Sequence, residues 1–255
     1  MSAGPGSGDA AARPPLRIVD APSPNHGPRP AGGRIDILLL HYTGMPSAGA
    51  ALDRMRDPAA EVSAHYMIDE DGTVYRLVPE DRRAWHAGRS SWGGETDINS
   101  ASIGIEIVNP GHEFGYRPFP ELQMAAVETL CRDIVGRHPI PRHRVLGHSD
   151  VAPQRKEDPG ELFDWPRLAR AGIGLWPDAA APVADVPGDI AAAQALLAAI
   201  GYAVPSTGIL DIETMKVVTA FQRRFRPARC DGMLDEETRQ RVAAVGALFR
   251  GKPDG

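Results

Sequence analysis

The feature that most constrains the fold is a short apolar run at residues 37–40 that ends directly on His41. A nearly continuous apolar segment of this length is typical of a β-strand that is buried on both faces. We therefore expect a sheet with layers packed on its two sides. A histidine stands at the end of one of its inner strands.

Other strand and helix patterns surround this run. Strand-like apolar segments lie at residues 62–68, 73–78, 102–108 and 144–146. The first two flank an acidic turn at residues 69–72, which predicts a hairpin. Residues 120–137 have a helical pattern whose apolar face holds Leu122, Ala126, Leu130, Ile134 and Val135. Strands mixed with helices in this way predict an α/β fold with a central mixed β-sheet flanked by helices.

The C-terminal part has a different pattern, which predicts a second, smaller domain. Helical patterns recur at residues 189–200, 212–225 and 235–248, after an Ala/Pro/Val stretch without periodicity. The expected organisation is a disordered tail at 1–13, a main domain at 14–178, a linker at 179–188 and a three-helix domain at 189–255. We expect the tail to be disordered because its Gly, Ala and Ser residues offer little apolar surface to bury.

Charge and hydropathy argue against several partners. The net charge is −5 and no Lys/Arg-rich block occurs, which argues against nucleic acid and against an anionic membrane surface. No run of about 18 apolar residues is present, so no membrane span is expected. The first 13 residues contain no apolar core of a signal peptide, which predicts a cytoplasmic protein. The alternative is a periplasmic or outer-membrane-associated protein whose leader is missing.

Three candidate metal ligands lie at strand ends or in the loops that follow them. His41 ends the first strand, His148 follows the strand at residues 144–146, and Asp158 lies ten residues further on. Two neutral imidazoles and one carboxylate suit Zn²⁺, and three protein ligands leave one position open for water. Each residue alone is a weak indication, since a single His is more often a surface or core residue. Their assignment as a set depends on a wider resemblance.

A resemblance to zinc N-acetylmuramoyl-L-alanine amidases of the AmpD/AmiD type is carried by residues 148–160 (HSDVAPQRKEDPG). This group belongs to the amidase-2 superfamily, which also holds peptidoglycan-recognition proteins and amidase-type phage lysozymes. Further segments match in the same order: 41–43 (HYT), 62–66 (VSAHY), 84–88 (AWHAG) and 99–106 (NSASIGIE). The resemblance covers residues 15–177 and implies an enzyme that cuts the amide bond between N-acetylmuramic acid and L-alanine.

The resemblance also implies roles for individual residues. It makes His41, His148 and Asp158 the zinc ligands, and it makes Glu106 the catalytic carboxylate that orients or deprotonates the attacking water. Lys156 matches the family's lysine near the metal, which stabilises the oxyanion.

Two more residues and one departure complete the expected site. Arg155 and His86 are expected to line the cleft for the peptide stem, with Arg155 suited to a stem carboxylate through bidentate pairing. Some superfamily members place a catalytic Tyr where this chain has Ala64. We therefore expect Glu106 to do that work, as in the AmpD/AmiD branch.

The C-terminal domain resembles a three-helix peptidoglycan-binding-like module at residues 208–211, 221–225 and 231–238. The expected function is hydrolysis of 1,6-anhydro-muropeptides in cell-wall recycling, with these peptidoglycan fragments as partners. Two alternatives remain: an exported AmiD-type amidase that acts on intact peptidoglycan, and a peptidoglycan-binding protein without catalysis. The last is disfavoured because every ligand and catalytic residue of the family pattern is present.

Overall fold

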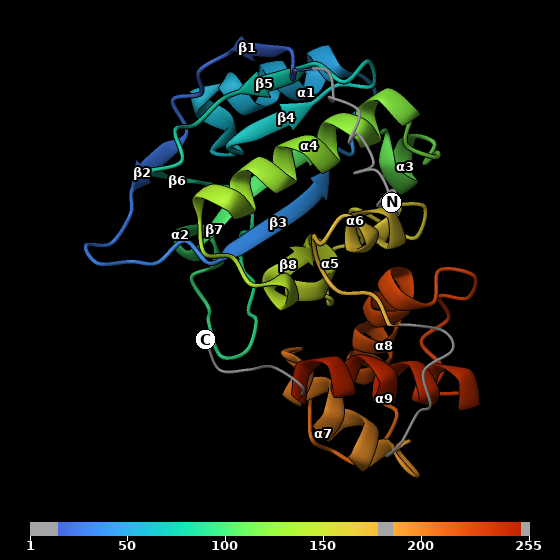
Figure 1. Ribbon diagram of the computed structural model, residues 1–255. Helices are drawn as coiled ribbons and strands as arrows, with labels where there is room; N and C mark the ends of the chain where they lie inside the picture. The colour runs from blue at the N-terminus through green and yellow to red at the C-terminus, as the bar shows by residue number, and fades with distance from the viewer. Residues whose placement is uncertain (1–14, 178–185, 251–255) are drawn as a thin grey trace, which may run out of the picture.

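The computed structural model describes residues 15–177 and 186–250. The predicted tail at 1–13 lies outside the described residues, as does most of the predicted linker at 179–188. Up to residue 177 the chain forms a unit with a sheet, and from residue 186 it forms a small helical unit (Figure 1).

The larger unit is built on a six-stranded sheet with the order β1-β5-β4-β7-β3-β8. These strands are β1 (Ile18–Asp20), β3 (Ile37–Tyr42), β4 (Tyr66–Ile68), β5 (Val74–Arg76), β7 (Ser102–Ile107) and β8 (Val145–Gly147). Strands β4 and β5 pair antiparallel as the predicted hairpin, whereas the other neighbours in this sheet are parallel. Strands β2 (His26–Pro28) and β6 (Arg82–Ala84) form a separate antiparallel pair. The predicted mixed sheet is confirmed.

Strand β3 is buried on both faces, as its apolar run predicts. Leu38 and Leu40 pack in a cluster with residues of helix α4 (Glu121–Arg137), while Ile37 and Leu39 belong to a cluster on the other side. Successive side chains of a strand point to opposite faces, so an unbroken apolar run serves two cores at once. Helix α1 (Ala48–Arg56) contributes Met55 to a third cluster with residues of β4 and its neighbours.

Helix α4 lies across one face of the sheet (Figure 1). Its buried face holds Met124, Val127, Leu130, Cys131 and Ile134. The predicted apolar face was wrong at Leu122, which is 67% exposed. Leu122 lies in the first turn of the helix, where Met124 is the apolar side chain that is buried.

Short helices fill the connections: α2 (Ile98–Ala101), α3 (Gly111–Phe114), α5 (His148–Val151), α6 (Trp165–Arg170), and the 3₁₀ turns Pro58–Ala60 and Arg142–Arg144. Helix α5 begins at the carboxyl end of β8 and helix α3 follows β7. Of the helices described, none has both the length and the apolar character needed to cross a membrane.

The helical unit consists of α7 (Ile190–Ile200), α8 (Ile212–Phe225) and α9 (Glu236–Arg250), close to the predicted ranges. The buried amide of Gln222 ties α8 to the following turn: it accepts from Gly232 N and donates to the carbonyl of Met233 and to Thr238. The unit packs below β8 and α5 (Figure 1), where Gly93 N donates to the carbonyl of Gly201 at 2.8 Å.

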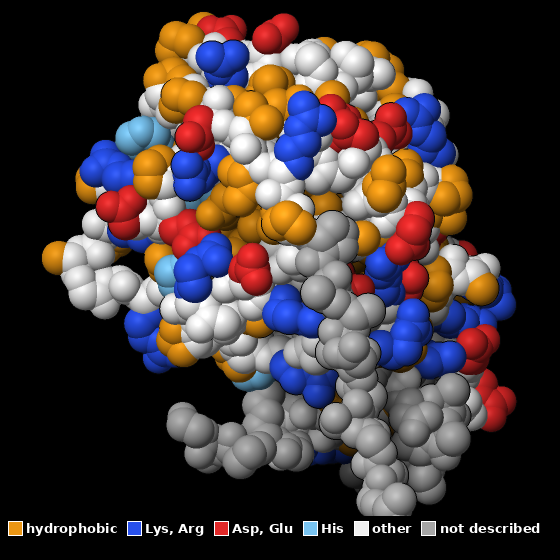
Figure 2. Space-filling model, turned by 45° about the horizontal axis from the view of Figure 1, so that its top comes forward, with side chains coloured by type: hydrophobic (Ala, Val, Ile, Leu, Met, Phe, Trp, Pro, Cys, Tyr) orange, Lys and Arg blue, Asp and Glu red, His pale blue; other side chains and the backbone are white. Residues whose placement is uncertain are grey.

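The surface carries both signs of charge. On the face shown in Figure 2, Lys and Arg side chains alternate with Asp and Glu side chains and with apolar ones.

Candidate metal centre and active-site cleft

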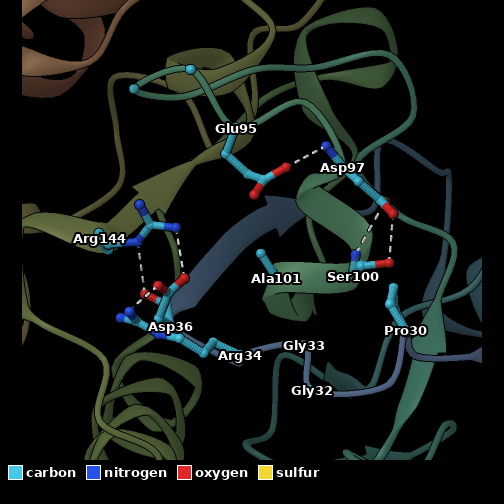
Figure 3. Close-up of a pocket in the computed structure, with 12 residues that line it drawn as sticks. Pro30, Gly32, Gly33, Arg34, Asp36, Glu95, Asp97, Ser100, Ala101 and Arg144 are labelled. Atoms are coloured by element: carbon cyan, nitrogen blue, oxygen red, sulfur yellow. Dashed lines mark hydrogen bonds and ion pairs between the residues drawn. The ribbon is translucent and has the colours of Figure 1, made fainter.

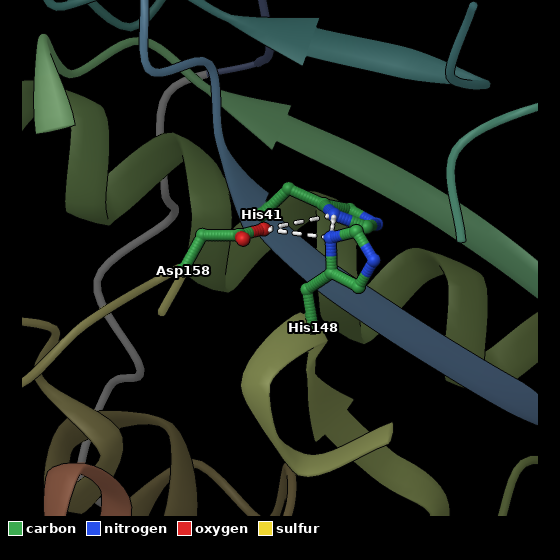
Figure 4. A group of neighbouring side chains, drawn as sticks. All are labelled: His41, His148 and Asp158. Carbon is green, nitrogen blue, oxygen red and sulfur yellow. Dashed lines mark hydrogen bonds and ion pairs between the residues drawn. The ribbon is translucent and has the colours of Figure 1, made fainter. Parts of the chain in front are cut away.

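Two adjacent parallel strands bring the predicted histidines together. His41 lies in β3, and His148 begins α5 directly after β8. The strands pair with Leu40 opposite Gly147, so both histidines lie at the same edge of the sheet. Asp158 lies in the loop after α5, and its side chain points toward both histidines (Figure 4).

The three side chains converge on one point. Nδ1 of His41 lies 2.9 Å from Nδ1 of His148, and each nitrogen lies 3.0 Å from Oδ2 of Asp158 (Figure 4). All three residues are buried. Nε2 of His148 lies 3.0 Å from the carbonyl oxygen of Ala87. Because a carbonyl oxygen only accepts, Nε2 is the nitrogen that donates to it, and Nδ1 is the nitrogen that can present a lone pair to a metal ion.

This donor set fits a metal ion. Lone pairs that meet at 2.9 to 3.0 Å repel one another unless a proton or a cation lies between them. Zn²⁺ binds His nitrogen and Asp oxygen at about 2.0–2.2 Å in tetrahedral geometry, which places ligand atoms roughly 3–3.5 Å apart. Within the residues that the structure describes, no second group of three His, Cys, Asp or Glu side chains has this arrangement.

His86 lies behind His41 and supports it. Its Nδ1 lies 3.0 Å from His41 Nε2, and its Nε2 lies 3.3 Å from the hydroxyl of Ser102. A metal-binding histidine is commonly oriented by a partner at its second nitrogen. Burial lowers the pKa of His41 to about 4 and the pKa of His86 well below its usual value, so both rings are neutral. The structure thus places His86 on the cleft floor, 7% exposed, with its ring nitrogens occupied.

We expect Gly104→Ala to destabilise the fold by about 1–3 kcal/mol, the usual cost of overpacking a core. Gly104 lies in β7 against the His86 ring, and a Cβ atom there would lie 2.6 Å from three ring atoms. Chemical denaturation measures the change in the free energy of unfolding.

The control for this prediction is Gly136→Ala in α4, where a Cβ atom meets nothing within 4 Å. That variant should be neutral or gain up to about 1 kcal/mol from the higher helix propensity of Ala. Equal stability of Gly104→Ala and the wild type would show that the strand and the ring are less tightly packed than the structure indicates.

Glu106 lies beside the donor set. It pairs in register with His41 across β3 and β7, so both side chains leave the sheet on the same side. Its Oε2 is buried and has no hydrogen-bond partner among the described residues. Burial, and secondarily the negative charge of Asp158, raises the pKa of Glu106 well above its usual value, while the charge of Lys156 lowers it. An unpaired buried carboxyl oxygen next to a metal-binding group can accept a proton from water.

A polar cleft of about 370 Å³ opens over these groups. Glu106, Lys156 and Arg155 line it together with His86, His148 and Asp158. The guanidinium of Arg155 donates through Nε to the carbonyl of Arg89 and through Nη2 to the carbonyl of Ala87. Of the Arg155 nitrogens, Nη1 is the one without a hydrogen bond in the described part of the chain.

One part of the cleft lining was not predicted from the sequence. Tyr42 and His112 form it, and the Tyr42 hydroxyl lies 3.0 Å from His112 Nδ1. His112 Nε2 lies 3.2 Å from both carboxylate oxygens of Glu161. A signal existed: His112 follows the strand that carries Glu106 by only a few residues, so it had to lie near the same sheet edge.

A second cavity, of about 690 Å³, lies at the opposite end of β3 (Figure 3). Its two arginines are paired with one carboxylate: Asp36 binds Arg144 at 2.6 Å and Arg34 at 3.1 Å. One oxygen of Glu95 accepts from the backbone N–H of Asp97. Among the residues that the structure describes, none that lines this cavity has an unpaired buried donor or acceptor like Oε2 of Glu106.

The fold and the cleft together define a class, a hydrolase in which a mixed sheet presents a buried set of metal donors beside an unpaired glutamate. Residues 31–161 match the family described as N-acetylmuramoyl-L-alanine amidase, and residues 187–242 match the putative peptidoglycan binding domain. The chain belongs to the N-acetylmuramoyl-L-alanine amidase family, as the sequence resemblance predicts.

Curated relatives agree with this assignment. The chain is 39% identical over 231 residues to the N-acetylmuramoyl-L-alanine amidase AmiD of Escherichia coli (strain K12), covering 83% of this chain and 82% of that protein. It is 35% identical over 171 residues to the 1,6-anhydro-N-acetylmuramyl-L-alanine amidase AmpD of Enterobacter cloacae, covering 59% of this chain and 89% of that protein.

A solved structure of Escherichia coli AmiD, in complex with its substrate, superposes with a TM-score of 0.76 at 37% identity and covers 88% of this chain and 92% of that one. AmpDh3 of Pseudomonas aeruginosa superposes with a TM-score of 0.76 at 32% identity, covering 86% of this chain and 94% of that one. Both likenesses extend well beyond the length of the amidase segment.

Proposed function

We propose that the protein is a zinc-dependent amidase that hydrolyses the bond between N-acetylmuramic acid and L-alanine in soluble 1,6-anhydro-muropeptides. The observation that carries the proposal is the convergence of His41, His148 and Asp158, whose donor atoms lie 2.9 to 3.0 Å apart, beside the unpaired Oε2 of Glu106. The non-catalytic alternative is disfavoured, because a protein that only binds peptidoglycan has no need of this arrangement.

The proposed chemistry divides among the cleft residues. Zinc at the three ligands would supply Lewis acidity toward the attacking water and the scissile carbonyl. Glu106 is proposed to take the proton from that water and return it to the leaving nitrogen. Lys156 is proposed to offset the negative charge that develops on the carbonyl oxygen. Arg155 and His86 keep their proposed place in the cleft: Arg155 faces the peptide stem, and His86 acts from below through His41.

The substrate class is proposed from the relatives. The AmiD structure holds anhydro-N-acetylmuramic acid-L-Ala-D-gamma-Glu-L-Lys, and an AmpDh3 structure holds an anhydromuramic pentapeptide. The proposed setting is the cytoplasm, where such fragments are soluble. The alternative is an exported enzyme that acts on intact peptidoglycan outside the cytoplasm. One observation favours that alternative: the match to AmiD runs over 231 residues, whereas the match to AmpD runs over 171.

The proposed division of the chain follows the sequence prediction, with the amidase domain at 14–178 and the peptidoglycan-binding-like domain at 189–255. Family matches at residues 31–161 and 187–242 support it.

We expect the purified protein to cleave soluble anhydro-muropeptides with a higher kcat/KM than insoluble sacculi. A small cleft of about 370 Å³ suits a single muropeptide stem, which diffuses into it freely. Mass spectrometry of the released stem peptide measures both reactions, and the His148→Ala variant controls for a contaminating amidase. Faster turnover of sacculi would favour the wall enzyme over the recycling enzyme.

A further inference from the structure

A buried polar cluster joins the amidase unit to the helical unit. Its centre is Asp150, whose side chain is 1% exposed. Its Oδ1 accepts a hydrogen bond from the hydroxyl of Tyr202 at 2.5 Å, and its Oδ2 pairs with Arg224 Nη1 at 2.6 Å. Tyr202 follows α7 and Arg224 lies in α8, so both partners come from the helical unit. Burial and the charge of Asp150 raise the pKa of Tyr202 well above its usual value, so the hydroxyl keeps its proton and donates it.

This cluster lies directly behind a metal ligand. Asp150 belongs to α5, the four-residue helix that begins at His148. Its Oδ2 also accepts from Gly147 N at 2.8 Å, the residue just before His148. Arg224 reaches past Asp150 to the carbonyl of Val145 at 2.9 Å and thereby also holds β8. The turn that carries His148 is thus fixed on both sides through one arginine.

Helix α8 also contacts the chain segment that carries another ligand, Asp158. Arg223 of α8 forms an ion pair with Glu157, the neighbour of Asp158 in the chain. A backbone hydrogen bond of 2.9 Å from Ser149 N to the carbonyl of Asp158 links this segment to α5. Helix α8 therefore contacts both α5, which carries His148, and the loop that carries Asp158.

Short helices such as α5 hold their shape only through their contacts. A metal site binds tightly when its ligands are held in place by packing and by hydrogen bonds from surrounding residues. The guanidinium of Arg224 is itself fixed, because its Cζ lies 4.3 Å from the ring centre of Trp165 and its side chain is 4% exposed. Such a group is a rigid support for Asp150.

We propose that Arg224 and Tyr202 are positioning residues of the metal site, which hold Asp150 and through it orient His148. The helical unit is then a part of the catalytic scaffold, in addition to any role in binding peptidoglycan. This inference rests on the proposed zinc site at His41, His148 and Asp158.

The test compares two arginine variants of the full chain. Arg224→Met retains an unbranched aliphatic stem but removes the guanidinium, so Asp150 loses its ion pair. The matched control is Arg226→Met: Arg226 is also buried and ion-paired, but with Asp235 and Glu237 inside the helical unit. Zinc dissociation constants come from competition with a chromophoric chelator, and thermal melts of the same samples report stability.

We expect Arg224→Met to bind zinc about 10–100-fold more weakly than the wild type, the usual effect of losing a group that orients a ligand. Arg226→Met should lower the melting temperature yet keep the wild-type zinc affinity. Tyr202→Phe removes one hydroxyl and should weaken zinc binding roughly tenfold, at the lower end of that range. It carries the test if Arg224→Met does not fold.

Wild-type zinc affinity in Arg224→Met or in folded Tyr202→Phe would overturn the positioning role. Equal weakening in Arg226→Met would overturn it too, because general loss of stability would then explain the effect. The His148→Ala variant separates the two proposals. If it retains zinc, the proposed metal site itself is wrong. If it loses zinc while Arg224→Met does not, only the positioning role fails.

Discussion

The His148→Ala variant is expected to lose its zinc and, with it, all measurable amidase activity. His148 supplies one of three donor atoms that lie within 3.0 Å of one another, and its Nε2 is already bonded to the carbonyl of Ala87. No rotation of a neighbouring side chain replaces it, since His86 is held by His41 and Ser102. Elemental analysis after dialysis measures bound zinc, and release of stem peptide measures activity.

Two controls accompany this experiment. Stripping the wild type with a chelator should abolish the same activity, and added zinc should restore it, because ligands and metal are both required. His138→Ala removes a histidine that is paired with Glu80 at 2.7 Å, away from the cleft, and should keep one zinc per chain. Stoichiometric zinc in His148→Ala would show that the metal is bound elsewhere.

The Glu106→Gln variant is expected to bind zinc normally but to lose about 10²–10⁴-fold in kcat, the usual effect of removing a general base. The substitution keeps the shape of the side chain and removes only its ability to take a proton. Oε2 of Glu106 makes no hydrogen bond with the described residues, so the fold should tolerate the change. Steady-state kinetics on an anhydro-muropeptide, with zinc content measured on the same sample, test the prediction.

The matched control is Glu113→Gln. Glu113 lines the same cleft but is exposed at its rim, in α3. Its variant should turn over close to the wild-type rate. If Glu106→Gln does so as well, the proton is taken by another group, and the unpaired oxygen of Glu106 needs a different explanation.

The parts of the site that follow from local pattern were predictable from sequence. The apolar run before His41 required a doubly buried strand, and His148 followed a second strand of the same kind. The structure shows these two strands as parallel neighbours that end at one edge of the sheet, which brings the histidines together. Their selection as a pair of ligands depended on the family resemblance. The position of Glu106 beside His41 was not given by the motif. It follows from the register of β3 with β7, which the structure shows.

Other parts depended on contacts that leave no local pattern. The ion pair of Asp150 with Arg224 joins residues that are 74 positions apart, and neither shows periodicity or motif that points to the other. The contacts of the His86 ring with His41 and Ser102 were likewise not predictable, because sequence does not show which side of a loop a side chain takes. The prediction that Leu122 lies on the buried face was wrong, because helical spacing defines a face but not where the sheet stops covering it.

The ion pair between Asp150 and Arg224 also bears on how such proteins diversify. Modules joined only by a tether can be exchanged by recombination without harm to either part. Here the amidase unit carries a buried carboxylate whose two side-chain partners, Arg224 and Tyr202, lie in the C-terminal unit. A foreign module would leave that charge buried and unpaired unless it brought the same two side chains to the same place. We therefore expect the two units to evolve together, because a change at Asp150 or at its partners in one unit affects the other.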